Sequence, residues 1–110
     1  MKGLIKEKVN ECLRLVRMSN RKVNEIRFGE NESLVHQEMK KYLCNKLKSE
    51  GHYFVTEAIF ETGGRADILV LDEFKAIEIA VTEDELSILN KRKVYPKGIE
   101  IEVVRCGICN

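Results

Sequence analysis

Two acids, Asp67 and Glu78, stand inside apolar, strand-like runs of the segment GGRADILVLDEFKAIEIA, residues 63–80. A carboxylate is costly among aliphatic side chains unless something compensates its charge. If the two acids face each other across a hairpin they repel, and one is driven to take up a proton unless a cation lies between them. A divalent ion such as Mg²⁺ or Mn²⁺, bound also by the backbone carbonyl of Ile79, would remove the repulsion, activate a water molecule and stabilise charge on a phosphate.

A structural explanation stays open for the same residues. Glu78 would then pair with Arg65 or Lys40, or simply lie on an exposed face. His36 and Lys40 are four residues apart, so they share one helix face at the edge of its apolar stripe. For His36, a role in a site competes with that of a capping or partly buried histidine. Arg65 either contacts phosphate or neutralises Asp67.

Periodicity predicts the elements that position these residues. Helices are expected over residues 3–17, from 31–33 to Gly51, and from an N-cap at Thr82 to the basic turn 91–93. Strands are expected over residues 53–60, 65–71, 75–81 and 99–104. The polar and basic stretch 18–31 has no firm assignment.

From residue 32 onward the order is therefore α-β-β-β-α-β. A helical crossover makes the last two strands parallel, whereas the first three form an antiparallel meander, which gives a mixed four-stranded sheet with an extra N-terminal helix. A tight turn at 72–73 sets Asp67 opposite Glu78. Strand alternation places Ile68 and Ile77 on the face that packs on helices, and both acids on the opposite face.

The chain of 110 residues has the size of one domain, with residues 1–30 as N-terminal helix and basic connector and residues 31–110 as the α/β unit. The first 30 residues hold eight Lys or Arg against four Glu, which mildly favours nucleic acid as a partner. With neither a signal peptide nor a long apolar run in the sequence, we expect a cytoplasmic protein without membrane contact. The excess of Glu and Lys over Asp is typical of a thermophile. Cys106 and Cys109, without a second ligand pair, favour reduced thiols or a disulfide over structural zinc.

Four segments together resemble the PD-(D/E)XK nuclease superfamily, most closely its competence-protein CoiA-like type. They are ESLVHQEMK (32–40), GRADILV (64–70), AIEIAVTEDEL (76–86) and KRKVYPKGIEIEVV (91–104). They are similar to the Ser-x-x-His-x-x-x-Lys helix, the Arg-x-Asp-Ile strand and the Ile-Glu-x-x strand of that type. The resemblance covers residues 32 to about 105 and implies a restriction-endonuclease-like αβββαβ core.

The resemblance also implies site residues and a cofactor, Mg²⁺ or Mn²⁺. Asp67 and Glu78 would bind the metal, with the carbonyl of Ile79 and with Glu32 as further ligands. The superfamily's lysine, expected two residues after Glu78, is replaced by Ala80, so Lys40 is the candidate substitute. The implied roles of the remaining residues are catalysis for His36 and nucleic-acid binding for Arg65, Arg92 and Lys40.

Three functions follow as hypotheses. The first is a divalent-metal-dependent deoxyribonuclease of a repair, recombination or mobile-element system, which acts on DNA. The second is a catalytically inactive nucleic-acid-binding module that kept the fold, a hypothesis that Ala80 favours. The third is an assembly subunit. A homodimer that pairs through the amphipathic residues 3–17 is expected, because cutting both strands needs two sites.

Overall fold

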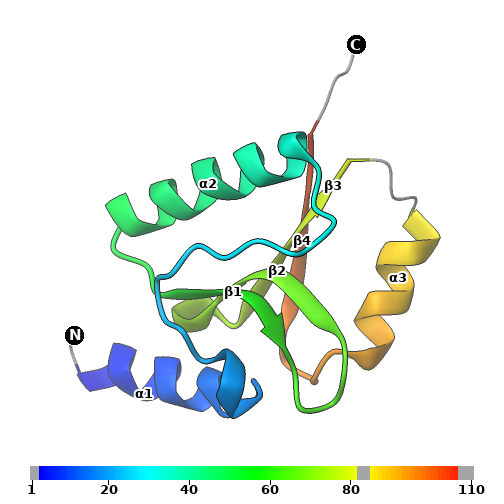
Figure 1. Cartoon of the computed structure of the whole chain (residues 1–110). Coiled ribbons are helices and arrows are strands. Elements are labelled where there is room, and N and C mark those ends of the chain that lie inside the picture. Colours follow the sequence, from blue (N-terminus) through cyan, green and yellow to red (C-terminus); the bar gives the residue numbers. More distant parts are fainter. Residues whose placement is uncertain (1–2, 82–84, 107–110) are drawn as a thin grey trace.

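The computed structural model describes residues 3–81 and 85–106 as a small α/β domain (Figure 1). Its helices are α1 (Gly3–Leu13), α2 (Leu34–Ser49) and α3 (Glu85–Val94), with short 3₁₀ turns η1 (Met18–Asn20) and η2 (Leu71–Glu73). Its strands are β1 (Phe54–Ile59), β2 (Arg65–Val70), β3 (Lys75–Ala80) and β4 (Glu100–Arg105). The expected N-cap at Thr82 and the expected role of Cys109 lie outside the described residues.

The sheet has the order β1-β2-β3-β4 and is mixed, as predicted. β1 and β2 are antiparallel, as are β2 and β3, whereas β4 runs parallel to β3. The β2–β3 pairing sets Ile68 beside Ile77 and Val70 beside Lys75, which is the predicted hairpin register. No helix in the described ranges is long and apolar enough to cross a membrane.

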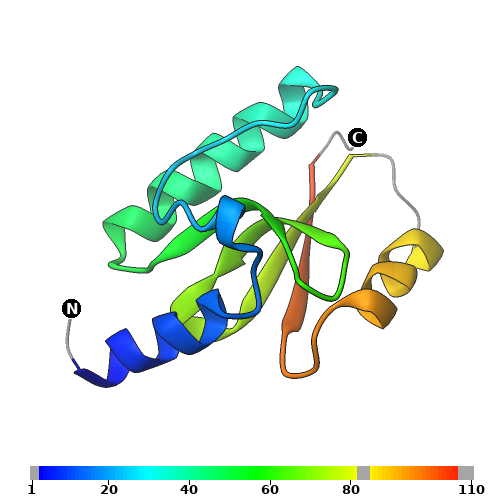
Figure 2. The same cartoon turned by 60° about the horizontal axis from the view of Figure 1, so that its bottom comes forward.

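Helices cover both faces of the sheet, α2 on one side and α1 on the other (Figures 1 and 2). On the α2 side, Cys44 and Leu47 pack with Ile68, Ile77 and other buried aliphatic residues. Ser33 caps the start of α2, because its side chain accepts a hydrogen bond from the backbone N–H of His36 at 3.1 Å, and the chain turns after the helix at Gly51, as predicted.

On the other face, Val9 and Cys12 of α1 pack against the sheet with Val16, Leu69 and Ala76. α1 ends at Leu13 rather than at residue 17, and Val16 instead forms an isolated β-bridge with Phe60. Most of the apolar face that the sequence offers for a homodimer is therefore buried in the fold, whereas Leu4 and Ile5 stay exposed. Pairing through residues 3–17 stays a prediction.

The basic connector, which had no firm assignment, runs along the outer edge of β1 (Figure 2). Asn24 and Phe54 exchange two hydrogen bonds, of 2.7 and 2.9 Å, and Thr56 Oγ1 bonds to the backbone of Glu25 and Arg27. The connector thereby occupies backbone groups of an edge strand that would otherwise be open to other chains.

Side-chain alternation reverses in the middle of the sheet. Glu57 in β1 has a left-handed backbone with φ 49°, and the β1–β2 pairing passes from Thr56–Ile68 to Ala58–Ala66 without joining Glu57 to Asp67. Ala58 and Ala66 both belong to the core on the α1 side. Glu57 and Asp67 instead contact residues of α2.

Asp67 therefore lies on the same side of the sheet as Ile68, and the expectation that it points to the opposite face is wrong. The reason is local: the β2–β3 ladder is paired only as far as Ile68–Ile77, and the Asp67 carboxylate then takes over the role of a backbone acceptor. Its Oδ2 accepts the N–H of Ile79 at 2.8 Å. Strand alternation does hold for Glu78, which faces away from α2.

Candidate functional site

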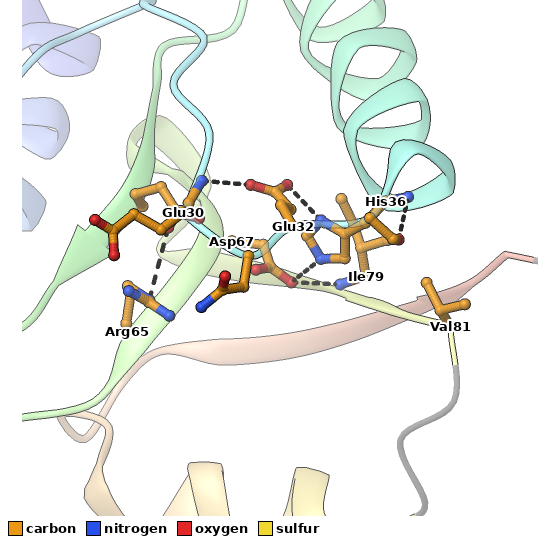
Figure 3. A pocket seen from close by; sticks show the side chains of 11 residues that line it. Glu30, Glu32, His36, Arg65, Asp67, Ile79 and Val81 are labelled. Atoms are coloured by element: carbon orange, nitrogen blue, oxygen red, sulfur yellow. Dashed lines mark hydrogen bonds and ion pairs between the residues drawn. The ribbon is translucent and has the colours of Figure 1, made fainter.

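A pocket of about 640 Å³ opens where β2 separates from β3, beside the N-terminal end of α2 (Figure 3). Glu32 and His36 line it from α2 and the loop before it, Asp67 from β2, and Ile79 from β3. These residues are far apart in sequence, and the reversal at Asp67 is what brings its carboxylate to the other three.

His36 is held between two carboxylates. Its Nδ1 is bonded to Glu32 Oε2, one helical turn earlier, and its Nε2 lies 3.4 Å from Asp67 Oδ2. A carboxylate on Nδ1 fixes the ring and favours the tautomer that presents Nε2 to a reactant. Figure 3 shows this chain of contacts from Glu32 through His36 and Asp67 to the backbone of Ile79. The arrangement suits a histidine that exchanges a proton with a bound molecule.

Glu32 is fixed by contacts to both of its carboxylate oxygens. Oε1 accepts hydrogen bonds from the N–H of Gly29 at 2.5 Å and from Lys40 Nζ at 3.1 Å, and Oε2 lies 2.9 Å from Lys40 Nζ. Partial burial raises the pKa of Glu32, but the hydrogen bonds from Gly29, Lys40 and His36 together outweigh it and hold the pKa below its usual value. Glu32 therefore stays ionised beside His36.

Lys40 does not reach the pocket floor near Asp67. Its fully buried side chain ends at Glu32, Glu57 and the carbonyl of Arg27, and Arg27 O and Glu57 Oε2 lie 3.0 and 2.9 Å from Nζ. Lys40 is the candidate substitute for the lysine absent at position 80, and its ammonium contacts Glu32 and Glu57 instead of Asp67 and Glu78. Because the Lys40 side chain is buried, its ammonium pairs with the two carboxylates next to it, those of Glu32 and Glu57.

Glu78 is separated from the pocket. Its carboxylate is buried on the other side of β3, where Tyr95 Oη lies 2.5 Å from Oε2 and Lys91 Nζ lies 3.0 Å from Oε1. Burial raises the pKa of Glu78 to about 7 and the charge of Asp67 adds to the rise, against the opposing hydrogen bonds of Tyr95 and Lys91. Neither of the alternatives considered for Glu78, pairing with Arg65 or Lys40 or lying exposed, is what the structure shows.

Of the three residues predicted to bind nucleic acid, Lys40 is fully buried, and the other two, Arg65 and Arg92, are exposed at different places. Arg65 lines the pocket at its rim with an exposed side chain, and its Nε lies 3.7 Å from Glu57 Oε1. Arg92 is exposed on α3 and does not line the pocket.

A hard cation fits this pocket only in part. Asp67 suits one, because Oδ1 has no hydrogen-bonding partner among the described residues and further carboxylates, Glu30 and Glu57, line the same pocket. Glu78 does not, because both of its oxygens are bound by Tyr95 and Lys91. Within residues 3–81 and 85–106, no group of three or more His, Cys, Asp or Glu is arranged to hold a metal ion.

Sequence reasoning missed two sets of residues. Glu57 stands in a run with ordinary strand alternation, and nothing in the sequence marks its left-handed backbone. Lys91 and Tyr95 looked like the end of a helix and the start of a turn, and only the packing of α3 brings them to Glu78. Both residues belong to the segment 91–104 that carries part of the resemblance, which gave neither of them a role. No protein-family model matches this chain, and neither does any curated protein or solved structure.

Proposed function

We propose that this protein is a divalent-metal-dependent deoxyribonuclease with a restriction-endonuclease-like core, and that the pocket around His36 and Asp67 is its reacting site. The observation that carries the proposal is the convergence of an oriented histidine and a carboxylate with one uncommitted oxygen at an open pocket. The resemblance of the four sequence segments supports the choice of DNA as the substrate.

Each residue has a distinct role in this proposal. Asp67 would hold Mg²⁺ or Mn²⁺ through Oδ1, and the ion would stabilise negative charge on the phosphate. One or two protein carboxylates are enough for Mg²⁺, because water and substrate phosphate complete its shell. His36, oriented by Glu32, takes a proton at Nε2 from the water that attacks phosphorus and returns one to the leaving oxygen. Arg65 at the rim contacts the phosphate backbone.

One observation favours a second function, an inactive nucleic-acid-binding module. Glu78 is bound by Tyr95 and Lys91, and Ala80 stands where the superfamily has a lysine, so two groups of the usual reacting site are not in the pocket. A module of this kind would bind DNA through its basic residues, without a reaction at Asp67.

Asp67→Asn separates the two functions. Because it removes the negative charge of the carboxylate that contacts His36 and that would bind the ion through Oδ1, we expect plasmid nicking in Mg²⁺ or Mn²⁺ to fall at least about 100-fold, while the fold is kept. His36→Gln should lower nicking by a similar factor and leave Mn²⁺ affinity unchanged.

The matched control is His52→Gln, which changes the other histidine of the chain, at the far end of α2. It should nick DNA as the parent does. A parent protein that binds DNA without nicking it, and whose DNA affinity does not depend on Asp67 or on divalent ions, would establish the inactive module instead.

A further inference from the structure

Lys40 lies in an environment made of oxygen atoms. Its ammonium is fully buried, and its three N–H groups have three oxygen-bearing partners, the carbonyl of Arg27 and the carboxylates of Glu32 and Glu57, all within 3.1 Å. The ring of Phe28 covers it at 5.6 Å from the ring centroid. Oxygen ligands of this kind are those that proteins use for hard metal ions.

The two carboxylates around Lys40 would repel each other without it. Glu32 and Glu57 are largely buried, with 7% and 14% of their side chains exposed, and both contact the same Nζ. Glu57 reaches this position only through its left-handed backbone, a conformation that costs energy for a residue with a side chain. Among the described residues Lys40 is the closer of the two ion-pair partners of Glu57, at 2.9 Å, and it is buried, whereas the pair to exposed Arg65 is 3.7 Å long and contributes little.

The effect of Lys40 extends to His36 through Glu32. Lys40 contacts both oxygens of Glu32, and Oε2 is also the atom that binds His36 Nδ1. His36 and Lys40, four residues apart, share one face of α2, and Glu32 in the loop just before the helix contacts both of them. A movement of Glu32 would release the imidazole.

We propose that Lys40 is a built-in counter-cation and a positioning residue: it holds Glu32 and Glu57 in the pocket wall and thereby orients His36 toward Asp67. With these two carboxylates neutralised from inside, Asp67 and the exposed Glu30 are the acids of the pocket lining left to meet a cation from solution. The inference adds to the proposed function, but its test needs no DNA cleavage, so the two can fail separately.

The test compares Lys40→Met with Lys41→Met, a neighbouring lysine whose side chain is half exposed and pairs with Glu38 on the surface. Lys40→Met should lower the melting temperature by more than about 10 °C, because it leaves two facing carboxylates buried without a cation. Lys41→Met should lower it by less than about 3 °C. Adding Glu57→Gln to Lys40→Met should recover part of the loss, because one of the two carboxylates is then neutral.

Nitrogen-15 spectra of the imidazoles report positioning directly, since the chain has two histidines and His52→Gln identifies the other one. We expect Lys40→Met to shift the His36 ring signals toward a mixture of tautomers, and Lys41→Met to leave them unchanged. If Lys40→Met does not fold, Glu32→Gln with Lys40 intact should produce the same change. Unchanged His36 signals in the folded variants, or melting losses of Lys40→Met and Glu57→Gln that simply add, would overturn the proposal.

Discussion

At the scale of single residues, environment decides what a carboxylate does. The β2–β3 register, continued past its last pair, would set Asp67 opposite Glu78, yet Asp67 lies in an open pocket and Glu78 is buried on the other side of the sheet. Tyr95 Oη lies 2.7 Å from the carbonyl of Arg65 and 2.5 Å from Glu78 Oε2. A phenol has a single proton, so both contacts are hydrogen bonds at once only when Glu78 is protonated and donates to Tyr95.

Glu78→Gln should remove a pH dependence of stability. The folded state raises the pKa of Glu78 from 4.5 to about 7, so it binds the extra proton and loses stability as pH rises through that window. The full loss corresponds to about 3 kcal/mol. Glutamine copies the neutral acid, because its amide oxygen can accept from Lys91 while its NH₂ donates to Tyr95. Urea unfolding between pH 4 and 8 measures the difference.

The exposed Glu73→Gln serves as the control for this series. Glu73→Gln should lose stability between pH 4 and 8 as the parent does. Glu78→Gln should instead be more stable than the parent at pH 8. Parallel curves for the parent and Glu78→Gln would mean that Glu78 is ionised throughout and held by Lys91.

At the scale of elements, the sequence predicted the strands and their order well. β-branched runs, the turn residues and the helical spacing of α2 determine which segments pair, and these signals are local. The reversal at Glu57 and Asp67 was missed because the contacts that accompany it, from Glu57 to Lys40 and from Asp67 to His36 and the Ile79 amide, join residues far apart in the sequence. The end of α1 was missed because the bridge from Val16 to Phe60 is also a tertiary contact.

At position 57, glycine should give a more stable protein than alanine, which is the reverse of their usual order of stability in strands. Ala ordinarily exceeds Gly in a strand by about 0.5–1 kcal/mol. At φ 49° the preference inverts, because a left-handed backbone costs a residue with a Cβ about 1–2 kcal/mol. Both variants lose the contact with Lys40, so the difference between their free energies of unfolding reports the cost of the backbone conformation alone. We expect Glu57→Gly to be more stable than Glu57→Ala in urea.

Glu102 in β4 provides the matched pair, since it is exposed and has no left-handed backbone. There Glu102→Ala should be the more stable variant. If alanine gave the more stable variant at both positions, β1 would have left its left-handed conformation at position 57 once the contact with Lys40 was lost.

At the scale of the whole molecule, one sheet separates two cores. Cys12 is buried on the α1 side and Cys44 on the α2 side. Burial raises the pKa of both thiols to about 12, with a further contribution from Asp72 at Cys12. Each thiol is therefore silent toward alkylating reagents until its own core opens.

Thiol labelling in a Cys106→Ser/Cys109→Ser background tests whether the two cores unfold together. The strands contribute side chains to both cores, so loss of one should remove the other, and we expect equal labelling rates for Cys12 and Cys44 at every urea concentration. Mass spectrometry of the two peptides measures the rates. Earlier labelling of Cys12 would show that α1 detaches as a separate unit.

The bond between Asp67 and the Ile79 amide has a spectroscopic consequence. An amide proton that points at an ionised carboxylate resonates at unusually low field, and its position follows the charge on that carboxylate. Ile79 belongs to β3 beyond its last pair with β2, so its amide proton points at this carboxylate instead of at a carbonyl of β2. A single resonance from the sheet can therefore serve as a native reporter of whatever enters the pocket, without a label and without a reaction.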